Sequence, residues 1–271
     1  MRYDLLTIES SPLDVRDVVV EAIQPTVEYP ETLDLRKDMP KVWDQGVDGP
    51  CSAFAAAAIK MWQEKKDYGL RDELSKYFIY NIRSNRPQPG MNPRDTMKIL
   101  QKYGVPTAKS YNLRKMKHPE RIPQWVWDEA ANHKIVAYGR VMTIDGLKKS
   151  LYKNGPAYIA MPVFNDSETF WKPGFGDKLL GGHALVVAGY TKDGFIIRNS
   201  WGSSWARGGH TLYPFSDFGA HYEIWTLIDD PNSTPVSMEV KHPEMQRKAK
   251  KEEKRSRKSI LDIFKSIFRK K

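Results

Sequence analysis

Three residues of this chain have the types and settings that nucleophilic catalysis needs: a cysteine, a histidine and an asparagine. The lone cysteine, Cys51, follows Gly49 and Pro50 at the predicted start of an alanine-rich helix. The free N–H groups and the dipole of a helix start favour a negative charge, which lowers the pKa of a thiol and makes it nucleophilic. An inert, packed cysteine is the alternative at such a position.

A thiolate needs an imidazole that shares its proton and later protonates the leaving group. His183 is the strongest of the six histidines because two glycines precede it and an apolar strand follows it. Small neighbours leave its ring open to a cleft, and the strand holds it rigidly. The others lie in polar segments, in a turn or at the start of a strand: His118, His133, His210, His221 and His242.

The third element is the segment NSWGSSW at residues 199–205, which ends an apolar strand. The side-chain oxygen of Asn199 can accept a hydrogen bond from an imidazole N–H and so fix its orientation. Trp201 and Trp205 can shield that bond from water. Taken alone, an exposed Asn-Ser pair would be only a turn.

Together, the segments DQGVDGPCSAF, GGHALVVAGY and IIRNSWGSSWARGGHTLYP contain these residues in the order Cys, His, Asn. The histidine and the asparagine follow the cysteine by about 130–150 residues, which is the spacing typical of papain-like peptidases. Over roughly residues 30 to 228 the chain therefore resembles the papain/cathepsin family of cysteine peptidases. It is most similar to the disulfide-free members found in microbes and large DNA viruses.

The resemblance implies a role for each matching residue. Cys51 is the expected nucleophile, His183 the general base and acid, and Asn199 the residue that orients the imidazole. Gln45 stands six residues before the cysteine and is the expected side-chain donor of an oxyanion hole. The backbone N–H of the cysteine would complete that hole. The expected substrate contacts are Trp201, Gly90, Gly182 and Ala184.

The implied reaction is acylation of the thiol by a peptide carbonyl, followed by hydrolysis of the thioester, as in a cysteine endopeptidase. A transpeptidase or ligase would use the same residues with an amine in place of water. A catalytically quiet module would hold peptides in its groove while its tail anchors it, although such a module needs none of the four catalytic candidates. The sequence has no Walker, dinucleotide-binding or metal-ligand motif, so we expect no metal and no cofactor.

Two departures from the family pattern flank the nucleophile. The family usually has a disulfide cysteine at the position of Asp48 and a tryptophan at the position of Ser52. Because Cys51 is the single cysteine, no internal disulfide can form, which suits a reducing compartment. We expect an intracellular enzyme, in the cytoplasm or, if viral, in the virion or host cell. Ser52 leaves the packing beside the nucleophile in question.

The 271 residues can bury a sizeable core in one large domain or two packed ones. A helical pattern precedes a series of strand-like runs separated by Gly, Pro and Asp. We expect an α+β fold with a helical half at 29–133, a barrel-like, strand-rich half at 134–230 and the active-site cleft between them. No apolar run reaches the roughly 20 residues that span a bilayer.

Residues 1–28 form a predicted leader. We hypothesise that this leader lies near the cleft and restrains access; an ordinary extension packed elsewhere is the alternative. Its first residues lack a basic segment leading into an apolar core, so we expect no secretory signal.

The chain ends in a predicted basic tail at 231–271. Its last part, 241–271, carries 13 Lys or Arg against four acids, whereas the rest of the chain is nearly neutral. The segment SILDIFKSIF has apolar residues at helical spacing and predicts an amphipathic helix. We expect an anionic membrane surface or an acidic partner to bind this tail, with nucleic acid less favoured and a solvated end as the alternative. The body should act as a monomer on peptide or protein substrates.

Overall fold

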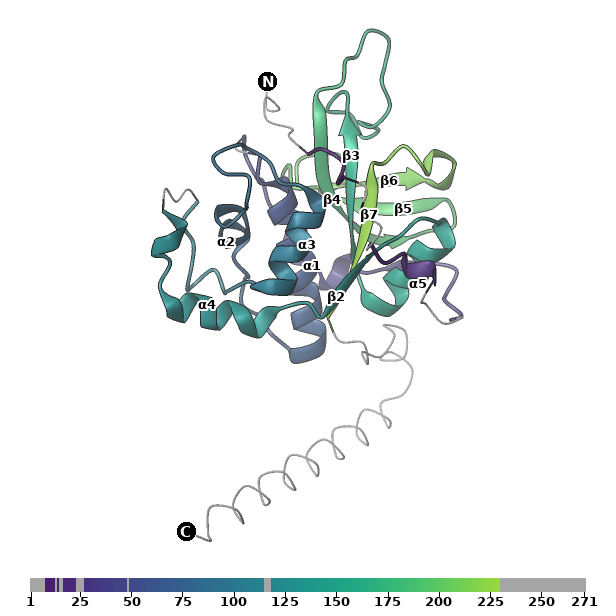
Figure 1. Ribbon diagram of the computed structural model, residues 1–271. Coiled ribbons are helices and arrows are strands. Elements are labelled where there is room, and N and C mark those ends of the chain that lie inside the picture. The colour runs from purple at the N-terminus through teal and green to yellow at the C-terminus, as the bar shows by residue number, and fades with distance from the viewer. Residues whose placement is uncertain are drawn as a thin grey trace, which may run out of the picture. The chain divides into compact units, whose positions relative to one another are not determined.

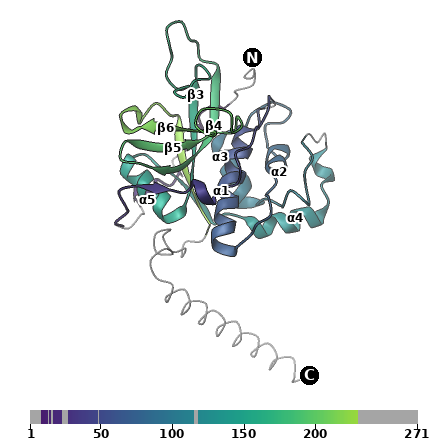
Figure 2. The ribbon, with the colours of Figure 1, turned by 180° about the vertical axis from the view of Figure 1, so that it is seen from behind.

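The protein is described by a computed structural model over residues 8–12, 14, 17–22, 27–47, 49–114 and 118–229. The predictions for Asp48 and for the basic tail lie outside the described residues. Within them, the helices α1 to α4 gather on one side and the strands with α5 on the other (Figure 1). The view from behind shows the same separation (Figure 2).

The alanine-rich helix predicted to start at Cys51 forms, and capping residues lie at the ends of several helices. Asn92 accepts a hydrogen bond from the backbone N–H of Arg94, and Gly69 and Gly155 end their helices with positive φ angles of 70° and 85°. The α-helices are α1 (Cys51–Tyr68), α2 (Lys76–Asn81), α3 (Pro93–Lys102), α4 (Gln124–Ala130) and α5 (Ile144–Asn154). Short 3₁₀ turns lie at Val20–Ala22, Arg36–Asp38, Pro119–Arg121, Ala131–His133 and Phe215–Asp217.

The strands pair antiparallel in one sheet of order β2-β7-β3-β4-β5-β6, and β1 pairs with β4 outside that path. They are β1 (Leu33–Asp34), β2 (Ala137–Arg140), β3 (Ala157–Val163), β4 (Gly181–Tyr190), β5 (Gly194–Arg198), β6 (His210–Pro214) and β7 (Glu223–Ile228). The predicted α+β class is confirmed. The sheet is open, however, because β2 and β6 form its two edges without pairing to each other, and this corrects the expected barrel-like closure.

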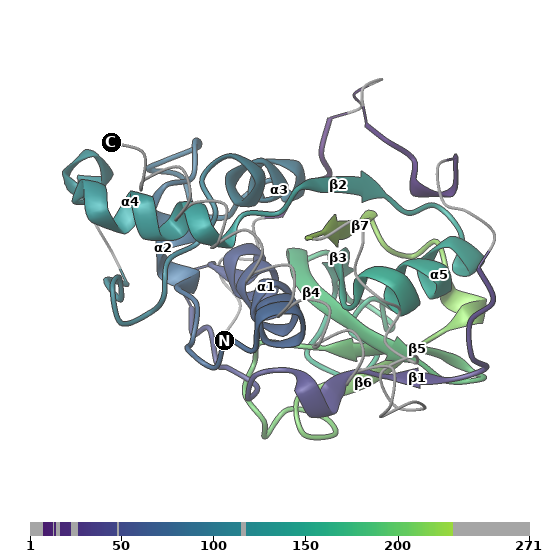
Figure 3. The same ribbon diagram turned by 90° about the horizontal axis from the view of Figure 1, so that it is seen from below.

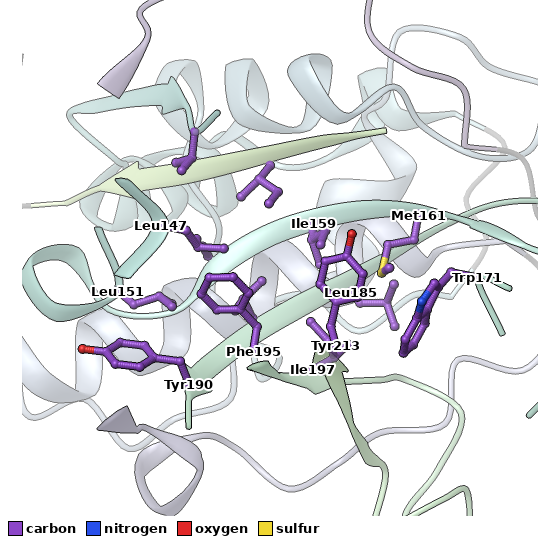
Figure 4. Packing of buried hydrophobic residues seen from close by; sticks show 14 of the residues in the cluster. Leu147, Leu151, Ile159, Met161, Trp171, Leu185, Tyr190, Phe195, Ile197 and Tyr213 are labelled. Atoms are coloured by element: carbon purple, nitrogen blue, oxygen red, sulfur yellow. The ribbon is translucent and has the colours of Figure 1, made fainter. Parts of the chain in front are cut away.

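The sheet is covered by a different helix on each face. Alternate residues of β3, among them Ile159 and Met161, pack with Leu147 and Leu151 of α5 in the larger hydrophobic core (Figure 4). Tyr158, the residue before Ile159, points to the other face, where it meets α1. Seen from below, α1 runs beside β4 (Figure 3). The cysteine helix therefore packs directly on the sheet that carries the histidine.

Candidate active site

Cys51 is the first residue of α1, and its side chain is buried with 1% of its surface exposed. Burial raises the pKa of the Cys51 thiol to about 11, and the backbone N–H groups of Ala184, Ser52 and Cys51 itself only partly oppose this. Since Ala184 follows His183 on β4, the sulfur faces the strand that carries the histidine.

His183 is fully buried, and its ring is oriented by Asn199. The Asn199 side-chain oxygen lies 2.8 Å from His183 Nε2 and also accepts the backbone N–H of Ser200 at 2.7 Å. Because that oxygen can only accept, Nε2 must carry the ring proton in the neutral imidazole. Nδ1 is then unprotonated, and it has no hydrogen-bond partner among the described residues. This is the protonation state that a base for a thiol requires.

Burial also controls the charge of the imidazole. It lowers the pKa of His183 to about 4, although the hydrogen bond to Asn199 acts in the opposite direction. The described residues place no hydrogen bond between Cys51 and His183. Both shifts favour the uncharged thiol and the uncharged imidazole over a thiolate–imidazolium pair.

Trp201 covers the histidine. Its ring is stacked on the His183 ring, with centroids 4.7 Å apart and planes inclined by 16°. Phe170 and Trp205 meet the Trp201 ring edge-on, at 5.6 and 5.3 Å. This aromatic cover keeps water from the His183–Asn199 bond, which strengthens that bond by lowering the local dielectric.

Gln45 is held beside the same segment. Its backbone N–H donates to Ser200 O at 2.9 Å, and its side-chain oxygen accepts from Ser200 Oγ at 2.6 Å. Because the oxygen is occupied, the amide nitrogen is the end of the side chain that remains to donate elsewhere. The structure thus gathers Gln45 with His183, Asn199 and Trp201. Sequence reasoning missed Ser200, which orients two of these side chains, although it lies inside the NSWG segment.

A groove of about 820 Å³ lies next to the histidine. Gly182 lines it, as do Pro89 and Met91 on either side of Gly90. A side chain on Gly182 would collide with the carbonyl of Ile8, so the close approach of the leader requires glycine there. Of the predicted substrate contacts, Gly182 faces the groove, Gly90 sits in its wall loop, and Ala184 and Trp201 are buried.

The leader enters this groove. The backbone N–H of Ile8 donates to Gly182 O at 3.3 Å, and the Ile8 side chain is 97% buried, with 3% exposed. Glu9 and Ser10 also line the groove. Farther along the leader, Oδ2 of Asp17 pairs with Nη2 of Arg94 at 2.5 Å. Val20 packs in the larger hydrophobic core. The described part of the leader thus lies on the body, and its residues 8–10 lie in the groove next to the histidine.

No group of three or more His, Cys, Asp or Glu residues that could hold a metal ion occurs in the described part of the chain. Likewise, none of the helices in that part is long and apolar enough to cross a membrane.

A family profile described as papain family cysteine protease matches residues 29–216. An uncharacterized peptidase C1-like protein of Acanthamoeba polyphaga mimivirus is 27% identical over 271 aligned residues, which cover 83% of this chain and 87% of the relative. Cysteine proteinase 3 of Entamoeba histolytica is 26% identical, over 68% of this chain and 62% of the relative.

Among solved structures, the chain is similar to xylellain, a cysteine protease from Xylella fastidiosa, with a TM-score of 0.71 and 25% identity. The match covers 85% of this chain and 98% of xylellain. A procathepsin B of Trypanosoma congolense shares the fold, with a TM-score of 0.64 and 16% identity over 83% of this chain and 87% of the other.

Proposed function

The chain belongs to the papain family of cysteine proteases, and from this premise we propose that it hydrolyses internal peptide bonds through Cys51, His183 and Asn199. Membership makes it a cysteine peptidase that acts on peptides or proteins. The observation that supports the proposed residues is the bond from His183 Nε2 to Asn199, which leaves Nδ1 unprotonated while the Cys51 sulfur faces the same strand.

In the proposed reaction the Cys51 proton passes to His183 Nδ1, and the thiolate sulfur attacks the peptide carbonyl carbon. The carbonyl oxygen gains the negative charge and accepts hydrogen bonds from the Cys51 backbone N–H and the Gln45 amide. The imidazolium gives its proton to the departing amine, leaving a thioester. Water then attacks the thioester, His183 takes a proton from that water and returns it to the sulfur, and the carboxylic acid leaves.

We propose that the described form is a restrained state of this site. Ile8 sits on Gly182 beside the histidine, and burial holds both reacting groups neutral, with pKa values of about 11 for Cys51 and about 4 for His183. Admitting water to the site would move both pKa values back toward their ordinary range, which favours the ion pair.

A peptide-library digest tests the activity. The full-length chain and a variant lacking residues 1–10 are incubated with the library, with Cys51→Ala as the inactive control. We expect internal cleavage that depends on Cys51 and is faster without residues 1–10. Equal rates for the two forms would contradict the proposal that the leader restrains the site. Trimming only at peptide ends would contradict endopeptidase action. Products carrying an added amine would identify a transpeptidase, and no cleavage by either form would contradict the proposal.

Alkylation by iodoacetamide against pH tests the thiol directly, since Cys51 is the single cysteine and intact mass reports only on it. In the full-length chain, the rate should rise only toward pH 11. In the chain lacking residues 1–10, the apparent pKa should fall below the ordinary value of about 8.5, and His183→Ala should abolish that fall.

The remaining proposals concern the cellular location of the protein and the binding partner of its basic tail. We propose an intracellular, reducing location and an anionic membrane surface as the partner of the basic tail. Co-sedimentation with anionic liposomes, with and without residues 241–271, tests the second proposal. Equal sedimentation of the two forms would remove it.

A further inference from the structure

Three buried hydroxyl groups meet directly behind the nucleophile. Ser52 Oγ lies 2.6 Å from Thr96 Oγ1 and 2.8 Å from the hydroxyl of Tyr158. All three side chains have 0% of their surface exposed. Ser52 is the hub of this cluster, which joins α1 to α3 on one side and to β3 on the other.

The protons of the cluster run in one direction. Thr96 Oγ1 donates to the backbone carbonyl of Asn92 at 3.2 Å, and a hydroxyl has only one proton to give. Ser52 must therefore donate to Thr96, and Tyr158 must donate to Ser52. Every hydroxyl proton is used, so the three groups have one satisfied arrangement, which makes the cluster geometrically specific.

The cluster connects the two elements that the reaction has to align. Ser52 follows Cys51 in the first turn of α1, whereas Tyr158 belongs to β3, whose Met161 is the register partner of His183 on β4. The family resemblance leads one to expect a tryptophan at the position of Ser52. The small serine instead leaves room for a tyrosine hydroxyl from the opposite half.

We propose that Ser52, Thr96 and Tyr158 are positioning residues that hold Cys51 at its working distance and orientation from His183. This inference rests on the proposed function of that pair. The nucleophile and the base stand on separate elements, so small shifts of α1 on the sheet change their separation. A misplacement of about 1 Å can cost about 100-fold in rate.

The protonation of Tyr158 supports this role. Burial, followed by the proximity of Cys51, raises the pKa of Tyr158 well above its ordinary value. The hydroxyl therefore remains a donor throughout the pH range in which a thiol titrates, and the bond to Ser52 does not depend on pH there.

The test uses the full-length chain and two conservative deletions. Tyr158→Phe keeps the ring and removes the donor, and Thr96→Val keeps the shape and removes the acceptor of the Ser52 proton. Iodoacetamide alkylation against pH and peptide turnover are both measured. We expect kcat to fall about tenfold or more with KM within about twofold, and the apparent pKa of Cys51 to shift. Thr96→Ser, which retains a hydroxyl, should restore the wild-type values.

Ser150→Ala is the matched control. Ser150 Oγ donates to Thr226 Oγ1 at 2.5 Å, and both residues are fully buried between α5 and β7, on the opposite face of the sheet from α1. This variant should lose stability without changing the alkylation profile. A profile shifted as much as in Tyr158→Phe would mean general loosening and would overturn the proposal.

Wild-type kcat and alkylation profiles in folded Tyr158→Phe and Thr96→Val would also overturn it, and Thr96→Val decides alone if Tyr158→Phe does not fold. The two readouts separate this inference from the proposed function. If the wild-type chain cleaves no peptide, the proposed function fails, whereas alkylation still reports whether the hydroxyl cluster places the thiol.

Discussion

The first turn and the middle of α1 are held against the strand-rich half by different kinds of polar group. At the start of the helix, beside Cys51, the contact is the neutral hydroxyl cluster centred on Ser52. Nine residues on, Lys60 makes buried ion pairs with Glu64 at 2.7 Å and with Asp229, at the end of β7, at 2.5 Å. Nζ of Lys60 and the carboxylates are almost wholly shielded from water.

The difference follows from the role of each of these two regions of α1. A fixed charge near a buried thiol shifts its pKa strongly, because the interior screens charge poorly. Neutral hydroxyls orient the helix without that effect. About 13 Å farther along the helix, a charged cluster can hold the two halves together without acting on the thiol at short range. The positioning contact and the buried ionic contact are therefore separated along one helix.

Lys60→Ala should have the largest effect on stability. It removes the cation that the buried carboxylates of Glu64 and Asp229 share, although Glu64 keeps its pair with His133, and this costs about 3–5 kcal/mol in the free energy of unfolding. Urea denaturation measures this. The control is Lys65→Ala on the same helix, whose pair with Asp38 is about half exposed and whose loss should cost less than about 1 kcal/mol. Equal losses of stability in the two variants would show that the buried pairs of Lys60 contribute no more than an exposed pair does.

Ser52→Ala should cost less stability, about 1–3 kcal/mol, because it removes a neutral acceptor and leaves the Tyr158 hydroxyl without a partner. Urea denaturation of this variant and of Lys60→Ala compares how much stability the hydroxyl cluster and the ionic cluster each contribute. A larger loss for Ser52→Ala than for Lys60→Ala would reverse the comparison and make the hydroxyl cluster the main structural contact.

The ionic cluster around Lys60 should also be sensitive to acid. Burial alone raises the pKa of Glu64, but the hydrogen bond from His133 and the charge of Lys60 outweigh it, and the net pKa is lowered. A lowered folded pKa contributes stability above the ordinary value of about 4.3, and this is lost as pH falls through the folded pKa. Unfolding midpoints between about pH 6 and 3 should therefore fall more steeply for the wild type than for Glu64→Gln; parallel curves would count against the ionic cluster.

The smallest expected effect is the coupling between Ser52 and Lys60. Sites more than about 10 Å apart with no shared partner usually add within about 0.5 kcal/mol. The double variant Ser52→Ala with Lys60→Ala should therefore lose the sum of the single losses. A coupling well above this limit, measured by the same denaturation cycle, would show that α1 responds as one rigid body.

Much of this organisation could be predicted from the sequence. The alanine-rich helix that starts at Cys51 and the strand-like runs separated by Gly, Pro and Asp are local signals, because each depends on residues close in the chain. The family resemblance likewise rests on motifs that can be read without coordinates. These motifs accordingly predict the four catalytic candidates as one set.

The closure of the sheet and the contacts around the site depend on residues far apart in the chain. Pairing of β2 with β6 would depend on contacts between residues far apart in the chain. In the structure these strands do not pair, so the sheet is open. The partnership of Ser52 with Tyr158 joins positions 106 residues apart, and nothing in either local segment indicates it. The contact between Ile8 and Gly182 likewise joins distant parts of the chain, and neither local segment indicates it. Local propensity determined the elements of this protein, whereas their packing decided which hydroxyls, charges and leader residues surround the thiol.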